Sequence, residues 1–137
     1  MTSYEEIYNR FLQKCSDFSL AKLPGEDIEN MLRGWLKSAV VKFMRPKSDL
    51  SQRDDELRSF TIDLQEYEKE VLALMMVREW LRPQIASTTL TLQRYSKKEG
   101  YSQKEHLSGL IAFDETLRLE IKKLLRDESY ANNDYFG

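Results

Sequence analysis

The 137-residue sequence has little of what disulfide bonds, metal centres and phosphate-binding loops require. It holds one cysteine and one histidine, so an internal disulfide is impossible and a zinc site has too few soft ligands. Its five glycines are scattered, and neither a GxxxxGKS/T nor a GxGxxG loop occurs. We therefore expect no metal, no cofactor and no catalytic residue, and hence no enzyme.

Long apolar runs and a strong charge imbalance are absent as well. The longest apolar run covers residues 71–77, whereas a helix that spans a bilayer needs about 20 apolar residues. The first residues are acidic and polar, so we expect no signal peptide, no membrane association and synthesis in a cytoplasm. A net charge of −2 argues against a protein whose main task is to grip phosphate backbones.

The sequence does contain enough apolar material for one core. Its residues are 41% hydrophobic and 32% charged, as is usual in soluble globular domains. A chain of this length buries about two-thirds of the surface that it exposes when unfolded. We expect one helical domain over residues 1–128, followed by an aromatic C-terminal tail over residues 129–137.

Four segments repeat apolar residues at intervals of three and four, which is the spacing of one helix face. Ser3 and Glu6 have the spacing of a capping box and predict a first helix over about residues 4–16. Pro24-Gly25 should begin a second helix, which Pro46 should end.

The third helix is expected to start at Asp63 and to contain the apolar run. Pro83 lacks an N–H group, so this helix should kink or end just before it. The polar stretch 45–62 that precedes the helix fits neither helical nor strand periodicity. It predicts a connecting loop in which Phe60 or Ile62 contacts the core.

A turn at residues 97–100 should lead into the last helix. The spacing of Ser102 to Glu105 repeats that of a capping box, and the apolar periodicity continues to about residue 127. The predicted fold class is therefore all-α. Its architecture is an antiparallel bundle of four to five helices with a polar mid-chain loop and an extended C-terminal tail.

Three groups of side chains are candidates for chemistry, and their surroundings favour structural roles. Cys15 continues the apolar face of the first helix, which indicates a small buried residue rather than a reactive thiol. His106 lies in the first turn of the last helix without an identifiable catalytic partner, which favours a polar surface role. The acidic run Asp54-Asp55-Glu56 is expected to be a solvated loop.

The segment from 33 to 47 has no acid and five basic residues, namely Arg33, Lys37, Lys42, Arg45 and Lys47. Such a segment can contact nucleic acid or an acidic partner. A solvated helix face also contains such basic residues, and positive charges near a helix C-terminus are favourable. Because helical spacing spreads the five positions over about half a turn, we favour the solvated face.

The C-terminal residues carry three aromatic side chains, Tyr130, Tyr135 and Phe136. Polar tails rarely hold this much apolar area unless it docks on a surface. That surface belongs either to the same subunit or to a neighbouring protein, since aromatic residues are enriched in interface cores. Both interpretations stay open on the residues alone.

Five segments of the sequence, taken in order, resemble a family of small proteins from tailed phages and prophages of Gram-positive bacteria. They are GWLKSAVVKF at 34–43, DLSQRDDELRSF at 49–60, EYEKEVLALMMVREWLRPQI at 66–85, YSQKEHL at 101–107 and LRDESYANNDYF at 125–136. In size and helical character this family is similar to the head–tail connector proteins, also called adaptor or head-completion proteins.

The resemblance implies a non-enzymatic virion protein of the neck, at the head–tail junction. Twelve identical subunits would form a ring beneath the portal protein and would contact the next neck or tail-completion protein. DNA would only pass through the channel of that ring. Under this interpretation, Tyr130, Tyr135 and Phe136 dock on a neighbouring subunit or on the portal.

An alternative from another class is a small phage-encoded helical regulator that binds DNA or a host protein. It would need a recognition helix whose basic residues face a groove of the duplex. Only the segment from 33 to 47 offers such residues, and it also holds apolar residues of the second helix's buried face.

Overall fold

The computed structural model describes residues 1–15, 25–43, 46–92 and 101–133. These ranges contain four helices, namely α1 (Tyr4–Lys14), α3 (Gly25–Lys42), α4 (Glu66–Leu92) and α5 (Tyr101–Asn133). They also contain three two-residue strands, namely β1 (Thr2–Ser3), β2 (Arg53–Asp54) and β3 (Ser59–Phe60). The predominance of helix confirms the predicted class, to which the structure adds a small sheet.

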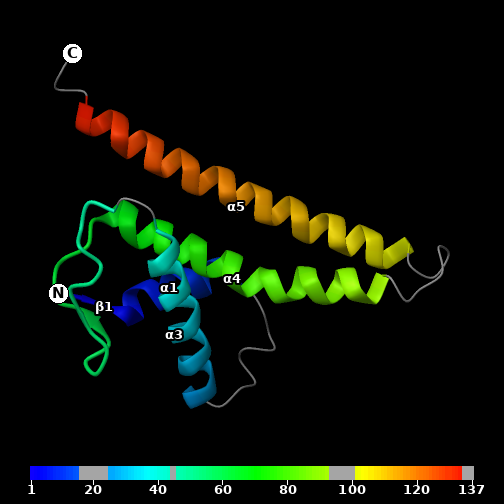
Figure 1. Cartoon of the computed structure of the whole chain (residues 1–137), viewed down its shortest axis with the longest axis horizontal. Coiled ribbons are helices and arrows are strands. Elements are labelled where there is room, and N and C mark those ends of the chain that lie inside the picture. Colours follow the sequence, from blue (N-terminus) through cyan, green and yellow to red (C-terminus); the bar gives the residue numbers. More distant parts are fainter. Residues whose placement is uncertain (16–24, 44–45, 93–100, 134–137) are drawn as a thin grey trace.

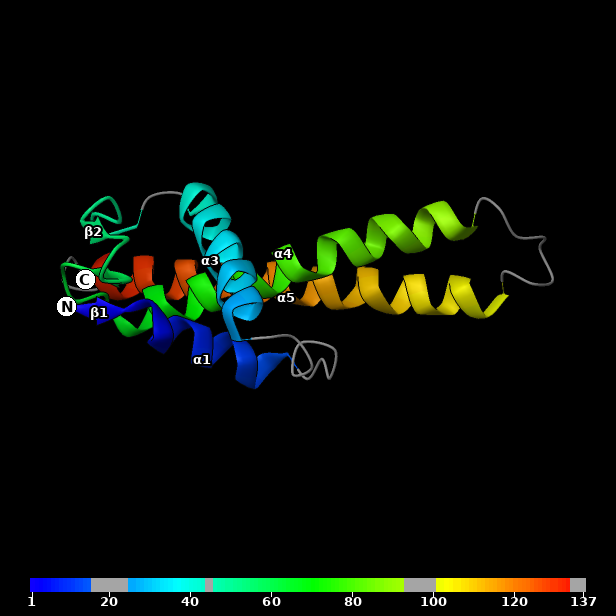
Figure 2. The same ribbon diagram turned by 90° about the horizontal axis from the view of Figure 1, so that it is seen from below.

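Helix α4 lies at the centre of the described part of the molecule (Figure 1). Helix α5 runs antiparallel along one side of α4, whereas α1 and α3 pack on the other side of its N-terminal half (Figures 1 and 2). The C-terminal half of α4 and the N-terminal half of α5 extend past α1 and α3, and we call this part the two-helix arm.

The middle of α4 is apolar on nearly every side. Its buried residues include Val71, Leu72, Ala73, Leu74, Met76, Val77 and Leu81. A helix with this pattern must be covered from several directions, and α1, α3 and α5 each contact it. Helix α4 is therefore the central element of the described part of the molecule. Within the described ranges, no helix combines the length and the apolarity needed to cross a bilayer.

The start of α4 and its passage through Pro83 differ in part from the prediction. The helix begins at Glu66 rather than at Asp63, and the Gln65 N–H donates to the Glu68 carboxylate at 2.9 Å. This bond is half of a capping box, set two residues later than the pattern predicts. Pro83 does not end the helix, which continues to Leu92, although its ribbon changes direction about midway (Figure 1).

The stretch predicted as a loop contains the small sheet. Strands β2 and β3 form an antiparallel hairpin, and β1 pairs with the other edge of β3, with Thr2 opposite Phe60. Strands of two residues are too short to give a periodic signal, which is why the sequence pattern misses them. Phe60 is completely buried, with its ring centre 5.2 Å from that of Tyr4, so the predicted core contact of Phe60 is confirmed.

The remaining helix boundaries lie close to the predicted ones. The Ser3 hydroxyl accepts a hydrogen bond from the Glu6 N–H at 3.4 Å, which confirms the predicted start of α1. Helix α3 begins at Gly25, whereas Pro24 lies outside the described residues. The predicted turn at 97–100 also lies outside them.

Helix α5 is longer than the sequence pattern predicts. It continues past residue 127 to Asn133, so residues 129–133, which were expected to belong to the tail, are helical. No proline occurs after residue 127, and the next glycine is Gly137, so neither residue type stops the helix there. Residues 134–137 lie outside the described part of the chain.

The full burial of Phe60 gives a stability prediction. Replacing Phe60 by Ala should lower the free energy of unfolding by about 3–5 kcal/mol, because the variant leaves a cavity between β3 and α1. Leu57→Ala in the adjoining turn is the control, since this side chain is 64% exposed and the change should cost under about 0.5 kcal/mol. Urea titrations followed by circular dichroism measure both. Equal losses would contradict the assignment of Phe60 to the core.

Candidate interaction surfaces

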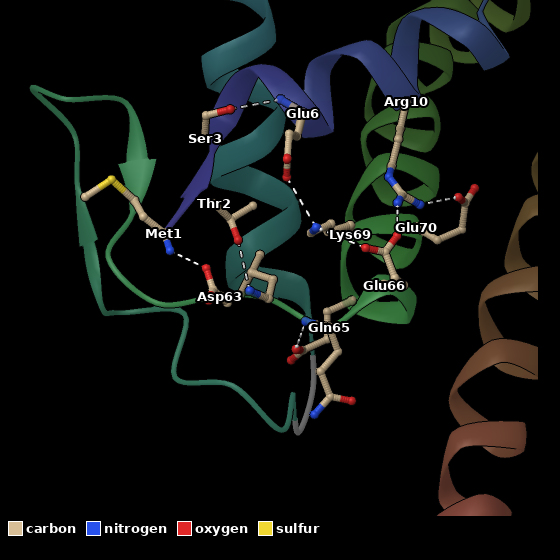
Figure 3. Close-up of polar contacts among 12 residues, drawn as sticks. Met1, Thr2, Ser3, Glu6, Arg10, Asp63, Gln65, Glu66, Lys69 and Glu70 are labelled. Atoms are coloured by element: carbon tan, nitrogen blue, oxygen red, sulfur yellow. Dashed lines mark hydrogen bonds and ion pairs between the residues drawn. The ribbon is translucent and has the colours of Figure 1, made fainter.

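A network of ion pairs joins α1 to the first turns of α4 (Figure 3). Arg10 pairs with Glu66 and, at 3.0 Å, with Glu70. Lys69 pairs with Glu6 at 3.3 Å and with Glu66 at 3.1 Å. Exposed pairs of this kind contribute little one by one, but a connected network fixes the position of α1 along α4.

The first residues of the chain are held by polar bonds as well as by β1. The Met1 amine pairs with Asp63, and the Leu64 N–H donates to the Thr2 hydroxyl at 2.9 Å (Figure 3). The Tyr4 hydroxyl donates to the Asp55 carboxylate at 2.7 Å. This bond lowers the pKa of Asp55, and the bond from the Met1 amine lowers the pKa of Asp63.

Glu68 is a completely buried acid that the sequence pattern does not single out. Its carboxylate accepts hydrogen bonds from the Ser48 N–H at 2.9 Å, from the Ser48 hydroxyl at 2.6 Å and from the Gln65 N–H. These donors satisfy the buried acceptor, as burial requires. Glu68 therefore joins the segment after α3 to the start of α4, which is a structural role.

Ion pairs connect α5 to α4 and to the segment after α3. The Arg78 guanidinium donates to both oxygens of Asp114, at 2.9 and 3.3 Å, and both side chains are half-buried. Two parallel hydrogen bonds of this kind stabilise the contact between the two helices and also specify their register. Lys47 pairs with Glu128 near the C-terminal end of α5.

The basic segment from 33 to 47 does not form one free cationic face. Lys42 pairs with Glu79 on α4, and Lys47 pairs with Glu128 on α5. Arg33 is half-buried, Lys37 is exposed, and Arg45 lies outside the described residues. The pairing of Lys42 and Lys47 with acids agrees with the solvated-face interpretation and reduces the positive charge available to a nucleic acid.

The other candidate residues take the positions that their patterns favour. Cys15 is buried at the end of α1, and it lines a cavity of about 370 Å³ together with Trp80, Leu110 and Phe113. His106 is exposed near the start of α5. The run Asp54-Asp55-Glu56 lies at the turn of the β2–β3 hairpin, where Asp54 accepts hydrogen bonds from the N–H groups of Glu56 and Leu57.

The side chains of the three predicted interface aromatics lie outside the described part of the chain. Tyr130 lies in the last turn of α5, but its side chain is outside the described part, as are Tyr135 and Phe136. Their docking on a neighbour therefore remains a prediction. Two other apolar surfaces, which the sequence pattern did not indicate, are exposed in the described residues.

The first surface is a groove of about 470 Å³ between α1, the start of α3 and the hairpin turn, which we call the α1–α3 groove. Leu12 and Leu57 border it, and their side chains are 41% and 64% exposed. Tyr8 is buried at its floor, and burial raises the pKa of this tyrosine to about 12. Glu29 and Arg58 line the same groove and pair with each other at 3.4 Å.

The second surface is the side of α5 turned away from α4, which we call the outer face of α5. Leu117 and Ile121 are buried against the rest of the chain, whereas Ile111 and Leu119 are each 51% exposed. Ala112, Leu119 and Arg126 follow one another at seven-residue intervals and therefore share one side of the helix. All three are exposed.

In the residues that the structure describes, no three histidine, cysteine, aspartate or glutamate side chains lie close enough together to hold a metal ion. No protein-family model, no curated protein and no solved structure matches this chain.

The three hydrogen bonds to Glu68 give a second stability prediction. In Glu68→Gln, an amide NH₂ group replaces one carboxylate oxygen and faces N–H and O–H donors, so the folded state should lose about 2–3 kcal/mol. Glu66→Gln is the matched control, because the Glu66 side chain is 76% exposed and solvent weakens its ion pairs, so this substitution should cost much less. Urea unfolding at pH 7 compares the two. An equal cost would show that Glu68 is not bonded as described.

The lowered pKa values near the N-terminus predict a loss of stability in acid. Hydrogen bonds from Lys69 and Arg10 lower the pKa of Glu66, and the Met1 amine lowers the pKa of Asp63. Their stabilising contribution is complete above the ordinary carboxyl pKa of about 4 and is lost as the pH falls through the lowered values. Urea midpoints measured from pH 6 to pH 2 should fall less steeply for the double variant Asp63→Asn, Glu66→Gln. Parallel pH profiles would refute this assignment.

Proposed function

We propose that this chain is a non-enzymatic structural subunit of a tailed-phage virion, specifically a head–tail connector that forms a ring beneath the portal. The proposal places it in the neck, between the portal and the next neck or tail-completion protein. Its partners are then copies of itself and these two proteins, while DNA only passes through the ring. The resemblance to the connector proteins implies a ring of twelve copies.

The observation that carries this proposal is the presence of exposed apolar side chains on opposite sides of α4. Leu12 and Leu57 lie at the α1–α3 groove, and Leu119 lies on the outer face of α5. A closed ring of identical subunits needs two different surfaces on each subunit, because its contacts run from head to tail. The five sequence segments that resemble the phage family support the same conclusion.

The charge distribution is compatible with a channel that DNA passes without binding strongly. The chain has a net charge of −2, and Lys42 and Lys47 are paired with carboxylates. The pairing of these two lysines leaves fewer cations in the segment from 33 to 47 for phosphate contacts, which weakens non-specific binding there. The same features weigh against the alternative of a DNA-binding regulator, which a salt-dependent shift of duplex DNA by the purified protein would support.

Electron microscopy of the portal mixed with this protein tests the proposed function. We expect an additional ring of density beneath the portal, with the same rotational order as the portal or a simple relation to it. The matched control is the portal alone. Density at the tail tip of virions, or no association with the portal, would overturn the proposal.

The predicted role of Tyr130, Tyr135 and Phe136 is tested by deleting residues 129–137. The deletion removes these side chains and the last five residues of α5, so ring assembly on the portal should be lost. The shortened monomer should stay folded, because the described buried core ends at Ile121. Circular dichroism checks folding. The triple variant Tyr130→Ser, Tyr135→Ser, Phe136→Ser removes the aromatic side chains without shortening α5, so it distinguishes the effect of the aromatics from the effect of helix length. Normal assembly of both variants would contradict this role.

A further inference from the structure

We propose that the α1–α3 groove of one subunit receives the outer face of α5 of a second copy of this chain. The proposal deepens the proposed function and rests on it, since it names the two surfaces that make the head-to-tail contact. Both surfaces consist of described residues, and neither includes Tyr135 or Phe136.

The α1–α3 groove has the shape and exposed residues of an acceptor. Leu12 and Leu57 come from α1 and from the hairpin turn, and together they place apolar area on two borders of one depression. Scattered single apolar residues are normal on a protein surface, but apolar residues gathered around a groove mark interaction sites. The described residues leave this groove uncovered.

The floor of the groove contains a buried tyrosine side chain, Tyr8. The Tyr8 side chain is 4% exposed, and its hydroxyl lies beside Glu29 and Arg33 without a hydrogen bond of normal geometry to any described residue. Buried hydroxyls without partners are rare in native proteins. Glu29 and Arg33, which lie next to this hydroxyl, also hold buried polar atoms without such a bond, so three polar groups close to the groove are unsatisfied.

Arg58 at the border of the groove has a backbone conformation that is uncommon for its residue type. Its φ is 53°, in the left-handed region that favours glycine, and its carbonyl accepts a hydrogen bond from the Tyr4 N–H at 2.9 Å. Such residues cost about 1 kcal/mol or more and cluster at functional sites. The conformation holds the turn that carries Leu57 beside α1.

The outer face of α5 is complementary to this groove in apolarity and charge. Leu119 lies near the exposed cations Lys122, Lys123 and Arg126, whereas Arg118 beside it is paired with Glu115 at 2.6 Å. Glu5 lines the groove together with the Glu29–Arg58 pair, and the turn of α3 that precedes Glu29 carries the exposed acids Glu26 and Asp27. A basic helix face around one leucine therefore fits an acidic groove bordered by two leucines.

The positions of the two surfaces determine the type of assembly. The outer face of α5 points away from α4 on the side opposite α1 and α3 (Figures 1 and 2), so one subunit cannot use both surfaces on itself. Contacts between two different surfaces repeat from copy to copy and close into a ring when the rotation allows it. Tyr130 follows Leu119 by eleven residues, three helical turns, so its backbone position lies on the same side of α5.

A complementation experiment with two exposed-site variants tests this contact. Leu57→Asp damages the groove, and Leu119→Asp damages the outer face of α5, so each variant alone should be monomeric in sedimentation velocity where the wild type associates. In an equal mixture, Leu119→Asp supplies an intact α1–α3 groove and Leu57→Asp supplies an intact outer face of α5. The mixture should therefore form one-to-one dimers and nothing larger, with a dissociation constant within threefold of the wild-type contact.

Val41→Asp is the matched control, because Val41 is 81% exposed on α3 but does not line the groove. This variant should assemble like the wild type. The proposal is overturned if the wild type stays monomeric up to millimolar concentration, if either leucine variant assembles normally, if the mixture stays monomeric, or if the control loses assembly equally.

The same variants distinguish this proposal from the proposed function. If wild-type protein forms a ring on the portal and both leucine variants form it equally well, the connector function stands and the contact is wrong. If complementation succeeds in solution but no variant and no wild-type protein binds the portal, the contact stands and the connector function is wrong.

Discussion

The burial of the apolar middle of α4 is the constraint on which the rest of the structure depends. Residues 71–77 are apolar on all sides, and a helix of that kind is stable in water only when other elements cover it from several directions. Helices α1, α3 and α5 supply that cover, because each presents one apolar stripe to α4. The chain reaches this arrangement without a disulfide, so apolar burial is the main term in its stability.

Polar contacts then select one arrangement of these helices among several that would bury similar area. The Arg78–Asp114 pair fixes the register of α5 against α4, and the α1–α4 ion-pair network fixes that of α1. Glu68 anchors the incoming segment through Ser48 at the point where α4 begins. Apolar stripes alone tolerate a shift of one helical turn, whereas these bonds would break on such a shift.

The sequence predicts those features that arise from neighbouring residues and misses those that join distant ones. The periodic stripes and the capping pair Ser3–Glu6 are local signals, and they place the helices to within a few residues. The β1–β3 pairing, the bonds of Glu68 and the groove between Leu12 and Leu57 each combine segments far apart in sequence, and none has a local pattern. For the same reason, single exposed leucines gave no signal, whereas the clustered aromatics near the C-terminus did.

Helix α4 is continuous through Pro83, yet its two halves have different surroundings. Residues 71–77 are almost entirely buried, whereas residues 84–92 in the two-helix arm are half-buried or exposed and contact mainly α5. We therefore expect backbone amides in the first half to exchange with solvent only when the whole domain unfolds, and those of the arm to exchange through local opening. The missing N–H of Pro83 lies between these regions, so the arm is able to tilt against a neighbouring molecule while the buried half of α4 stays fixed.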